Sequence, residues 1–242
     1  MADQSIADLN KAEETFNKGT ALLNDSKYEE ALQSFTSLIN EEKFAPELFL
    51  QIGNAQYRLQ NIGLAALSYR RALLLKSNLL EARQNLNLIK NKLGFVDSDP
   101  LNPSQVLVSS NESLIGTLLT ISLWLIGIGA ALLILKFRYK RSAITLLIIG
   151  SLCASSSAIL SKVRDSFRPD PRTNIVIKNN TVARTAPAQS ASTIIPLPPG
   201  SSVILVTVRD TWSYVKLPKE LHGWIKTDSL ESLWPYDPEF SD

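Results

Sequence analysis

The chain has 242 residues, and its 25 Lys and Arg against 23 Asp and Glu give a formal net charge of +2. So small an excess provides no long-range electrostatic reason to expect nucleic-acid binding. The single Cys, Cys153, excludes an intrachain disulfide, and the single His, His222, excludes any site that needs two imidazoles.

Nothing in the chain has the pattern of a catalytic or cofactor site. A hydrolytic triad needs a nucleophile, a base and an orienting group in contact, yet the only His precedes Gly223 in a predicted turn. No cluster has the spacing of metal ligands, and no phosphate-binding loop is present. We therefore expect a protein that is not an enzyme and that binds no metal, cofactor or nucleic acid.

Residues 12–93 are predicted to form a helical repeat that follows a flexible N-terminus at 1–11. Comparison of the chain with itself gives a period of 34 residues. The recurring pairs are Gly19 and Gly53, Ala31 and Ala65, and Phe35 and Tyr69. The pattern resembles the tetratricopeptide repeat (TPR), in which small residues let paired helices touch and an aromatic ring fills the gap between them. The resemblance predicts two repeats and a capping helix at 79–93 that covers an otherwise exposed apolar face.

A TPR domain generally binds peptides in the groove made by the first helix of each repeat. By motif position, the groove residues expected here are Phe16, Thr20, Asn54, Tyr57, Arg58 and Gln84. For Phe16 and Tyr57 the alternative is that they are packing residues. The carboxylate clamp of some TPR domains is not expected, because Leu50 stands at a key lysine position and Thr20 at an asparagine position.

After a linker at 94–113, two uncharged apolar stretches follow at 114–135 and 142–161. A helix rises about 1.5 Å per residue, so each stretch is long enough to cross a hydrocarbon core of roughly 30 Å. The sequence therefore predicts a hairpin of two transmembrane helices joined by the basic loop 136–141. Close helix contacts are expected at small residues four apart: Gly127 with Ala131, and Ser151 with Ser155. The alternative is a pair of buried helices in a soluble core.

Two spans would place both soluble parts on the same side of a bacterial inner membrane. The positive-inside rule predicts that the basic loop 136–141 lies in the cytoplasm. Both soluble parts would then lie in the periplasm. Residues 1–30 contain no apolar signal-peptide core. Either a signal sequence has been lost or both parts are cytoplasmic, and the periplasm is the prediction we carry forward.

A second linker at 162–173 leads to a predicted β-domain at 174–236, with a tail at 237–242. Short alternating runs separated by turn formers predict about five strands and a small barrel. An Arg184-to-Pro187 loop, a strand that begins at Trp212 and a Gly223-Trp224-Ile225 strand resemble the bacterial SH3 (SH3b) domain. Residues 186–199 would be its long loop. Trp212 and Trp224 are candidates for a ligand surface, or they pack the barrel.

The order of TPR region, two spans and SH3b domain resembles the BatE proteins of bacterial aerotolerance operons. Matching stretches include Tyr28-Glu-Glu-Ala-Leu32, Gly53-Asn-Ala55 and Ala82-Arg-Gln-Asn-Leu86. The resemblance implies a two-pass membrane scaffold that works beside von Willebrand A-domain proteins and a MoxR-type ATPase in stress tolerance or envelope integrity. The lipid bilayer would be a further partner. The alternative function is binding of peptidoglycan peptide or glycan through the SH3b domain.

Overall fold

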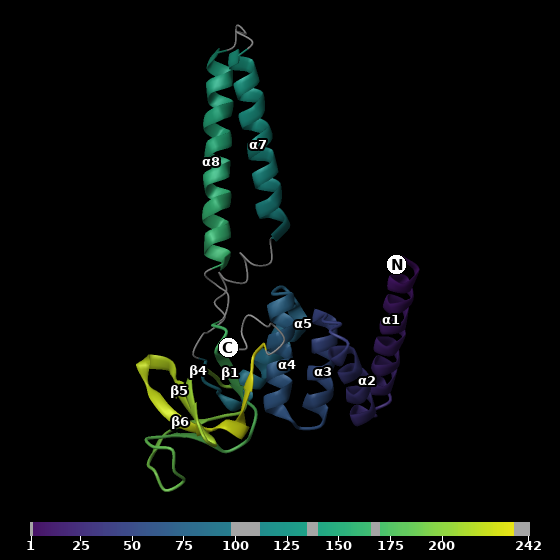
Figure 1. The fold of residues 1–242 in the computed structure, drawn as a ribbon, viewed down its shortest axis with the longest axis vertical. Coiled ribbons are helices and arrows are strands. Elements are labelled where there is room, and N and C mark those ends of the chain that lie inside the picture. Colours follow the sequence, from purple (N-terminus) through teal and green to yellow (C-terminus); the bar gives the residue numbers. More distant parts are fainter. Residues whose placement is uncertain (1, 98–111, 135–139, 166–169, 235–242) are drawn as a thin grey trace. The chain divides into compact units, whose positions relative to one another are not determined.

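The computed structural model describes residues 2–97, 112–134, 140–165 and 170–234. The chain divides into two compact units (Figure 1). One unit combines Met1–Pro100 with Pro169–Asp242, and the other is Leu101–Arg168. The first unit therefore joins the predicted helical repeat and the predicted β-domain in one body.

Five helices form the N-terminal part of the first unit, each packed against the next along the chain. They are α1 (Ala2–Asn24), α2 (Tyr28–Asn40), α3 (Pro46–Arg58), α4 (Ile62–Leu75) and α5 (Leu80–Leu93). Pro46 is preorganised for the first turn of α3, and Gly94 ends α5 in the left-handed conformation. Because α1 begins at Ala2, the segment predicted to be a flexible N-terminus is mostly helical.

The helices pair through the glycine and aromatic positions of the repeat. A Cβ placed at Gly19 would lie 2.5 Å from the Phe35 ring, and one at Gly53 would lie 2.5 Å from the Tyr69 ring. Phe35 and Tyr69 are fully buried. The close helix contact expected from the TPR-like spacing is thus present in both helix pairs.

Seven strands form one antiparallel sheet in the order β3-β2-β6-β5-β4-β1-β7. They are β1 (Thr173–Val176), β2 (Thr181–Arg184), β3 (Thr193–Leu197), β4 (Ser202–Arg209), β5 (Trp212–Lys216), β6 (His222–Lys226) and β7 (Leu230–Ser232). The buried face is apolar, with Val176, Val203 and Ile225 in its core. Strand β3 lies inside the predicted loop 186–199. Pro196 is tolerated there because β3 is an edge strand.

Helix α4 joins the helices to the sheet. It packs between α3 and α5 and also contacts β1, so its residues are buried almost all round. Leu67 forms an apolar cluster with Ile175 and Leu233. Beyond β7, the Trp234 ring lies 5.7 Å from the rings of both Phe44 and Phe49.

Two buried arginines of α4 complete this junction. Arg71 donates from Nε to the Leu233 carbonyl oxygen (3.0 Å) and from Nη2 to that of Ser232 (2.9 Å). Arg70 pairs with Asp97, which also accepts a hydrogen bond from Lys90 Nζ at 2.8 Å. Burying these charges is tolerable because each is paired or hydrogen-bonded.

The second unit is an antiparallel pair of helices, α7 (Glu112–Ile134) and α8 (Lys140–Asp165). They approach closely at Gly129, beside Ala143 and Leu147, and at Gly150, beside Ser122 and Ile126. The expected contacts at Gly127, Ala131, Ser151 and Ser155 are wrong. All four are exposed, and a Cβ at Gly127 would have nothing within 4 Å.

The predicted membrane hairpin is also wrong. Among the residues described, no helix is both long and apolar enough to cross a membrane.

Two further predictions are wrong for the same reason. They are the two-pass placement in the inner membrane and the periplasmic side of both soluble parts. The predicted fold class must be corrected too, because the described residues form helices and one seven-stranded antiparallel sheet in place of the predicted five-stranded barrel. Most of the predicted loop 136–141, much of the linkers 94–113 and 162–173, and the tail 237–242 lie outside the described residues.

Candidate functional site

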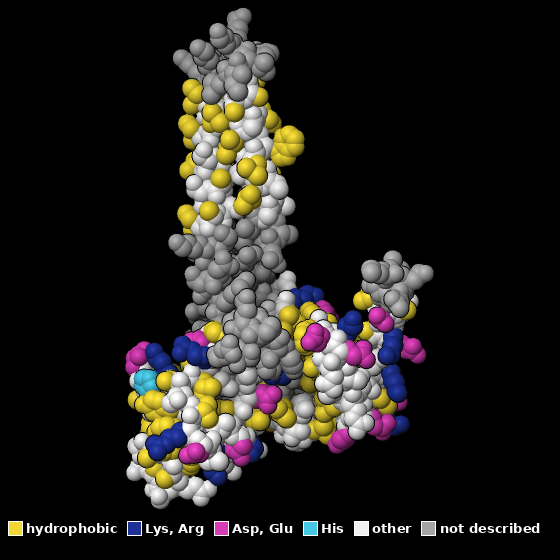
Figure 2. Space-filling model, in the orientation of Figure 1, with side chains coloured by type: hydrophobic (Ala, Val, Ile, Leu, Met, Phe, Trp, Pro, Cys, Tyr) yellow, Lys and Arg dark blue, Asp and Glu magenta, His cyan; other side chains and the backbone are white. Residues whose placement is uncertain are grey.

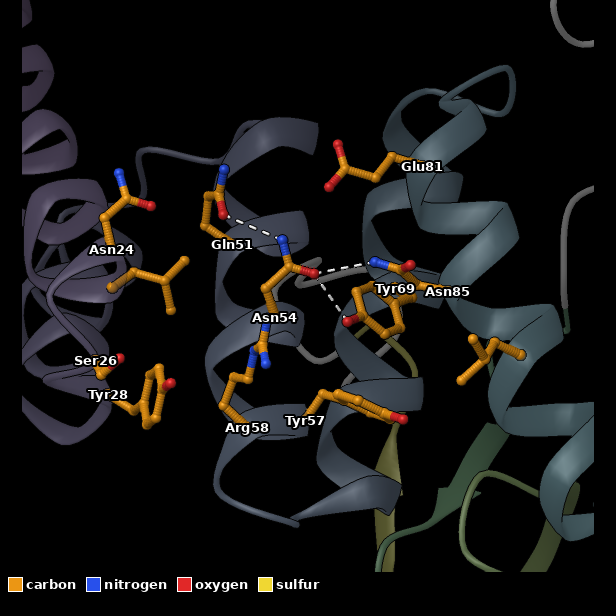
Figure 3. A pocket seen from close by; sticks show the side chains of 12 residues that line it. Asn24, Ser26, Tyr28, Gln51, Asn54, Tyr57, Arg58, Tyr69, Glu81 and Asn85 are labelled. Carbon is orange, nitrogen blue, oxygen red and sulfur yellow. Dashed lines mark hydrogen bonds between the residues drawn. The ribbon is translucent and has the colours of Figure 1, made fainter.

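A groove with a volume of about 710 Å³ crosses the helical part of the first unit (Figure 3). Its walls come from the end of α1, the start of α2, and helices α3, α4 and α5. The lining residues are Leu23, Asn24, Ser26, Tyr28, Gln51, Asn54, Tyr57, Arg58, Tyr69, Glu81, Asn85 and Leu88. Most of these side chains are polar, which favours a ligand rich in hydrogen-bonding groups.

Asn54 on α3 is the centre of a hydrogen-bond network in the groove. Its Oδ1 accepts from the Tyr69 hydroxyl at 2.9 Å and from Asn85 Nδ2 at 3.0 Å. Its Nδ2 donates to Gln51 Oε1 at 3.2 Å. These contacts from three helices fix the orientation of the Asn54 amide, as the dashed lines in Figure 3 show.

Tyr69 connects the groove to the helix core. Its ring is buried against Gly53, and only the hydroxyl reaches the polar network. Burial raises the pKa of the Tyr69 phenol well above its ordinary value of 10. The phenol therefore stays protonated at neutral pH and serves Asn54 as a hydrogen-bond donor.

The two charged residues of the lining have opposite signs. In Figure 3, Asn54 lies between Glu81 and Arg58. Glu81 comes from the first turn of α5 and Arg58 from the last turn of α3, and both are exposed. A ligand in the groove would thus meet a carboxylate toward one end and a guanidinium toward the other.

Three of the six predicted groove residues come together here: Asn54, Tyr57 and Arg58. Phe16 lies instead in the helix core, with its ring 5.8 Å from that of Phe35. The Thr20 hydroxyl donates to the Phe16 carbonyl oxygen at 3.0 Å.

Gln84 is exposed and lies outside the lining, where its neighbour Asn85 takes the expected place. The sequence reasoning also missed Gln51, Tyr69 and Glu81. The spacing of Glu81, Asn85 and Leu88 by four and three residues marks one face of a helix, and this signal could have corrected the register of α5.

The two tryptophans proposed as a ligand surface are half-buried on the sheet. Trp212 lines a hollow of about 450 Å³ together with Arg184 and Lys226. The ring of Trp224 lies 5.0 Å from that of Tyr214. Both tryptophans point away from the buried face of the sheet, while the alternate residues Ser213 and Ile225 point into it.

Within the described ranges, no group of three or more His, Cys, Asp and Glu residues could hold a metal ion. Comparison of the chain with protein-family models, curated proteins and solved structures gives no match. The assignment of a function therefore depends on the geometry of the groove and of the sheet surface.

Proposed function

We propose that this chain is a non-enzymatic adaptor that binds an extended segment of a partner polypeptide in the groove of its helical part. The observation that carries the proposal is the fixed Asn54 amide, which Tyr69, Asn85 and Gln51 hold from three directions. A side chain held in one orientation before binding loses less entropy when the ligand arrives.

The chemistry of the lining suits a peptide backbone. An amide side chain has two N–H donors and a carbonyl acceptor, and the network described uses one donor of Asn54 and one of Asn85. The remaining amide groups can pair with the N–H and C=O groups of an extended chain, which need partners when they leave water. Tyr28 of α2 and Tyr57 of α3 add ring surface to the lining.

The charges give the bound segment a direction. An acidic group of the partner would lie toward Arg58 and a basic group toward Glu81. Reversal of the peptide would place like charges together, which disfavours the wrong orientation. Following the resemblance to BatE proteins, von Willebrand A-domain proteins and a MoxR-type ATPase are the first partners to test.

A peptide selection tests this function. A random peptide library is selected on the immobilised unchanged chain, with no prior selection against any variant. We expect the selected peptides to bind the double variant Asn54→Ala/Arg58→Ala at least about tenfold more weakly than the unchanged chain, as measured by fluorescence anisotropy. The fold of each variant is checked by circular dichroism.

Gln84→Ala is the matched control, because Gln84 is a polar residue of α5 outside the groove lining. Its affinity for the selected peptides should equal that of the unchanged chain. Equal binding by the folded double variant, or an equal loss in Gln84→Ala, would show that the groove is not the peptide site.

A further inference from the structure

The outward face of strands β2, β5 and β6 combines aromatic rings with positive charges. Alternate residues of each strand are buried in the core and the others face outward. The outward residues are Val182 and Arg184 on β2, Trp212, Tyr214 and Lys216 on β5, and His222, Trp224 and Lys226 on β6. These eight positions hold four rings and three cations, and no acidic residue.

The strand register brings the rings together. Tyr214 pairs with Trp224 and Lys216 with His222 across β5 and β6, and Arg184 of β2 pairs with Trp224 from the other side. The Tyr214 ring lies 5.0 Å from Trp224 and 5.7 Å from His222, and it is close to parallel with the His222 ring. Figure 2 shows the His beside apolar side chains and near Lys and Arg on this part of the molecule.

The charge of this face is positive after its ion pairs are counted. Lys216 is paired with Glu220 at 3.1 Å. Arg184 donates to a neutral group, the Ala191 carbonyl oxygen, at 2.7 Å, and Lys226 is exposed. The net charge of +2 for the whole chain conceals this local excess, because the other charges lie elsewhere on the fold.

We propose that the β2–β6–β5 face binds single-stranded nucleic acid. Such a strand carries flat bases beside a chain of phosphates, and on this face a cation follows two rings on each strand, Lys216 on β5 and Lys226 on β6. Bases stack on aromatic side chains while cations follow the phosphates, a combination that tolerates many sequences. The hollow lined by Trp212, Arg184 and Lys226 continues the face beyond the Tyr214 and Trp224 rings, and the one carboxylate of its lining, Asp228, is paired with Lys178 at 2.7 Å.

The rings favour a single strand over the other anionic polymers. An acidic polypeptide would use the cations but would have no regular series of flat groups for the rings. In a duplex the bases are already stacked on one another, so the rings could not reach them. This site is separate from the helical groove, and it goes beyond the peptide-binding function.

The test uses the full chain and a fluorescein-labelled oligo(dT) of about twelve nucleotides, a length within the range of single-strand sites. We expect binding by anisotropy, with quenching of tryptophan fluorescence as bases stack. Two phosphate contacts, from Arg184 and Lys226, would give a log–log salt slope of about −1.4. The affinity would then fall roughly 7-fold between about 50 mM and 200 mM salt.

Two sets of variants locate the site. Lys216→Glu/Lys226→Glu should weaken binding at least about tenfold, whereas Lys18→Glu/Lys92→Glu, with the same change of net charge at exposed helix positions, should not. Trp224→Leu should weaken binding on the order of tenfold through lost stacking. Trp224→Phe, which keeps a ring, should retain most of the affinity of the unchanged chain. Circular dichroism shows whether each variant is folded.

Three results would overturn the proposal. The first is no binding of oligo(dT) by the unchanged chain at about 50 mM salt, where phosphate contacts are strong. The second is equal weakening by the two double lysine variants, which would indicate a charge effect without a site. The third is equal or tighter binding of poly-glutamate or of a DNA duplex, which would assign the face to acidic polypeptides or to phosphates alone.

Discussion

Gly63 of α4 lies directly against the backbone of Ile177, which follows strand β1. A Cβ placed at Gly63 would come within 2.4 Å of the Ile177 carbonyl oxygen and 2.5 Å of its Cα. Both of these atoms are backbone, so neither can rotate away as the end of a side chain could. The helical part and the sheet therefore meet here at a distance that only glycine permits.

Gly63→Ala should lower the free energy of unfolding by about 1–3 kcal/mol, because an added methyl group must push α4 away from the sheet. Urea denaturation followed by circular dichroism measures this loss. An unchanged unfolding midpoint would mean that α4 and Ile177 are not in close contact.

Arg71→Met should destabilise the first unit by about 2–3 kcal/mol. The buried hydrogen bond to the Leu233 carbonyl and the partly buried one to the Ser232 carbonyl would be lost, and an unsatisfied buried group costs about 1–3 kcal/mol. Lys178→Met is the control, since the ion pair of Lys178 with Asp228 is exposed to solvent and such pairs add little to stability. Equal effects of the two changes on denaturation would contradict the buried junction.

Tyr69→Phe should change how stability depends on alkaline pH. The folded-state pKa of Tyr69 is raised above the ordinary value of 10, so its contribution is complete below pH 10 and is lost as pH rises beyond it. Replacement by Phe costs about 1 kcal/mol at neutral pH through the lost hydrogen bond.

Above pH 10, the stability difference between the two proteins should shrink by up to about 1.4 kcal/mol per pH unit. Urea titrations of both proteins at several alkaline pH values give this difference. The other titrating groups are the same in the two proteins, so their contributions to the free energy of unfolding cancel. A difference that stays constant up to pH 12 would show that the Tyr69 phenol is not buried.

Gly53→Ala should damage the groove as well as the fold. The new methyl group would lie 2.5 Å from the Tyr69 ring, and displacement of that ring would break the Tyr69–Asn54 hydrogen bond. We expect a loss of about 1–3 kcal/mol in stability and weaker binding of the selected peptides. Gly127→Ala, at a helical glycine with nothing within 4 Å, should leave peptide binding unchanged.

The sequence predicted those features that depend on local spacing. The recurrence of Gly53 and Tyr69 identified a close helix contact, and motif position brought Asn54, Tyr57 and Arg58 to one groove. Gln84 shows the limit of such reasoning: an error of one position in α5 rotates a side chain by about 100° around the helix.

The junction of helices and sheet could not be predicted in this way. The partners of Arg70 and Arg71 lie far away in the sequence, and a charged residue in a helix is usually exposed. Only tertiary contacts bury these two side chains. The outward rings and cations of β5 and β6 were visible in the sequence one by one, but their shared face follows from the strand register.

The hydrogen bond between Arg71 and Leu233 joins residues 162 positions apart. During synthesis at about 5–20 residues per second, α4 leaves the ribosome roughly 8–30 s before the last strand can cover it. Throughout that time the apolar side of α4, with Leu67 at its centre, has no sheet to pack against. Until β1 and β7 have been made, this apolar side of α4 is a surface at which nascent chains can aggregate.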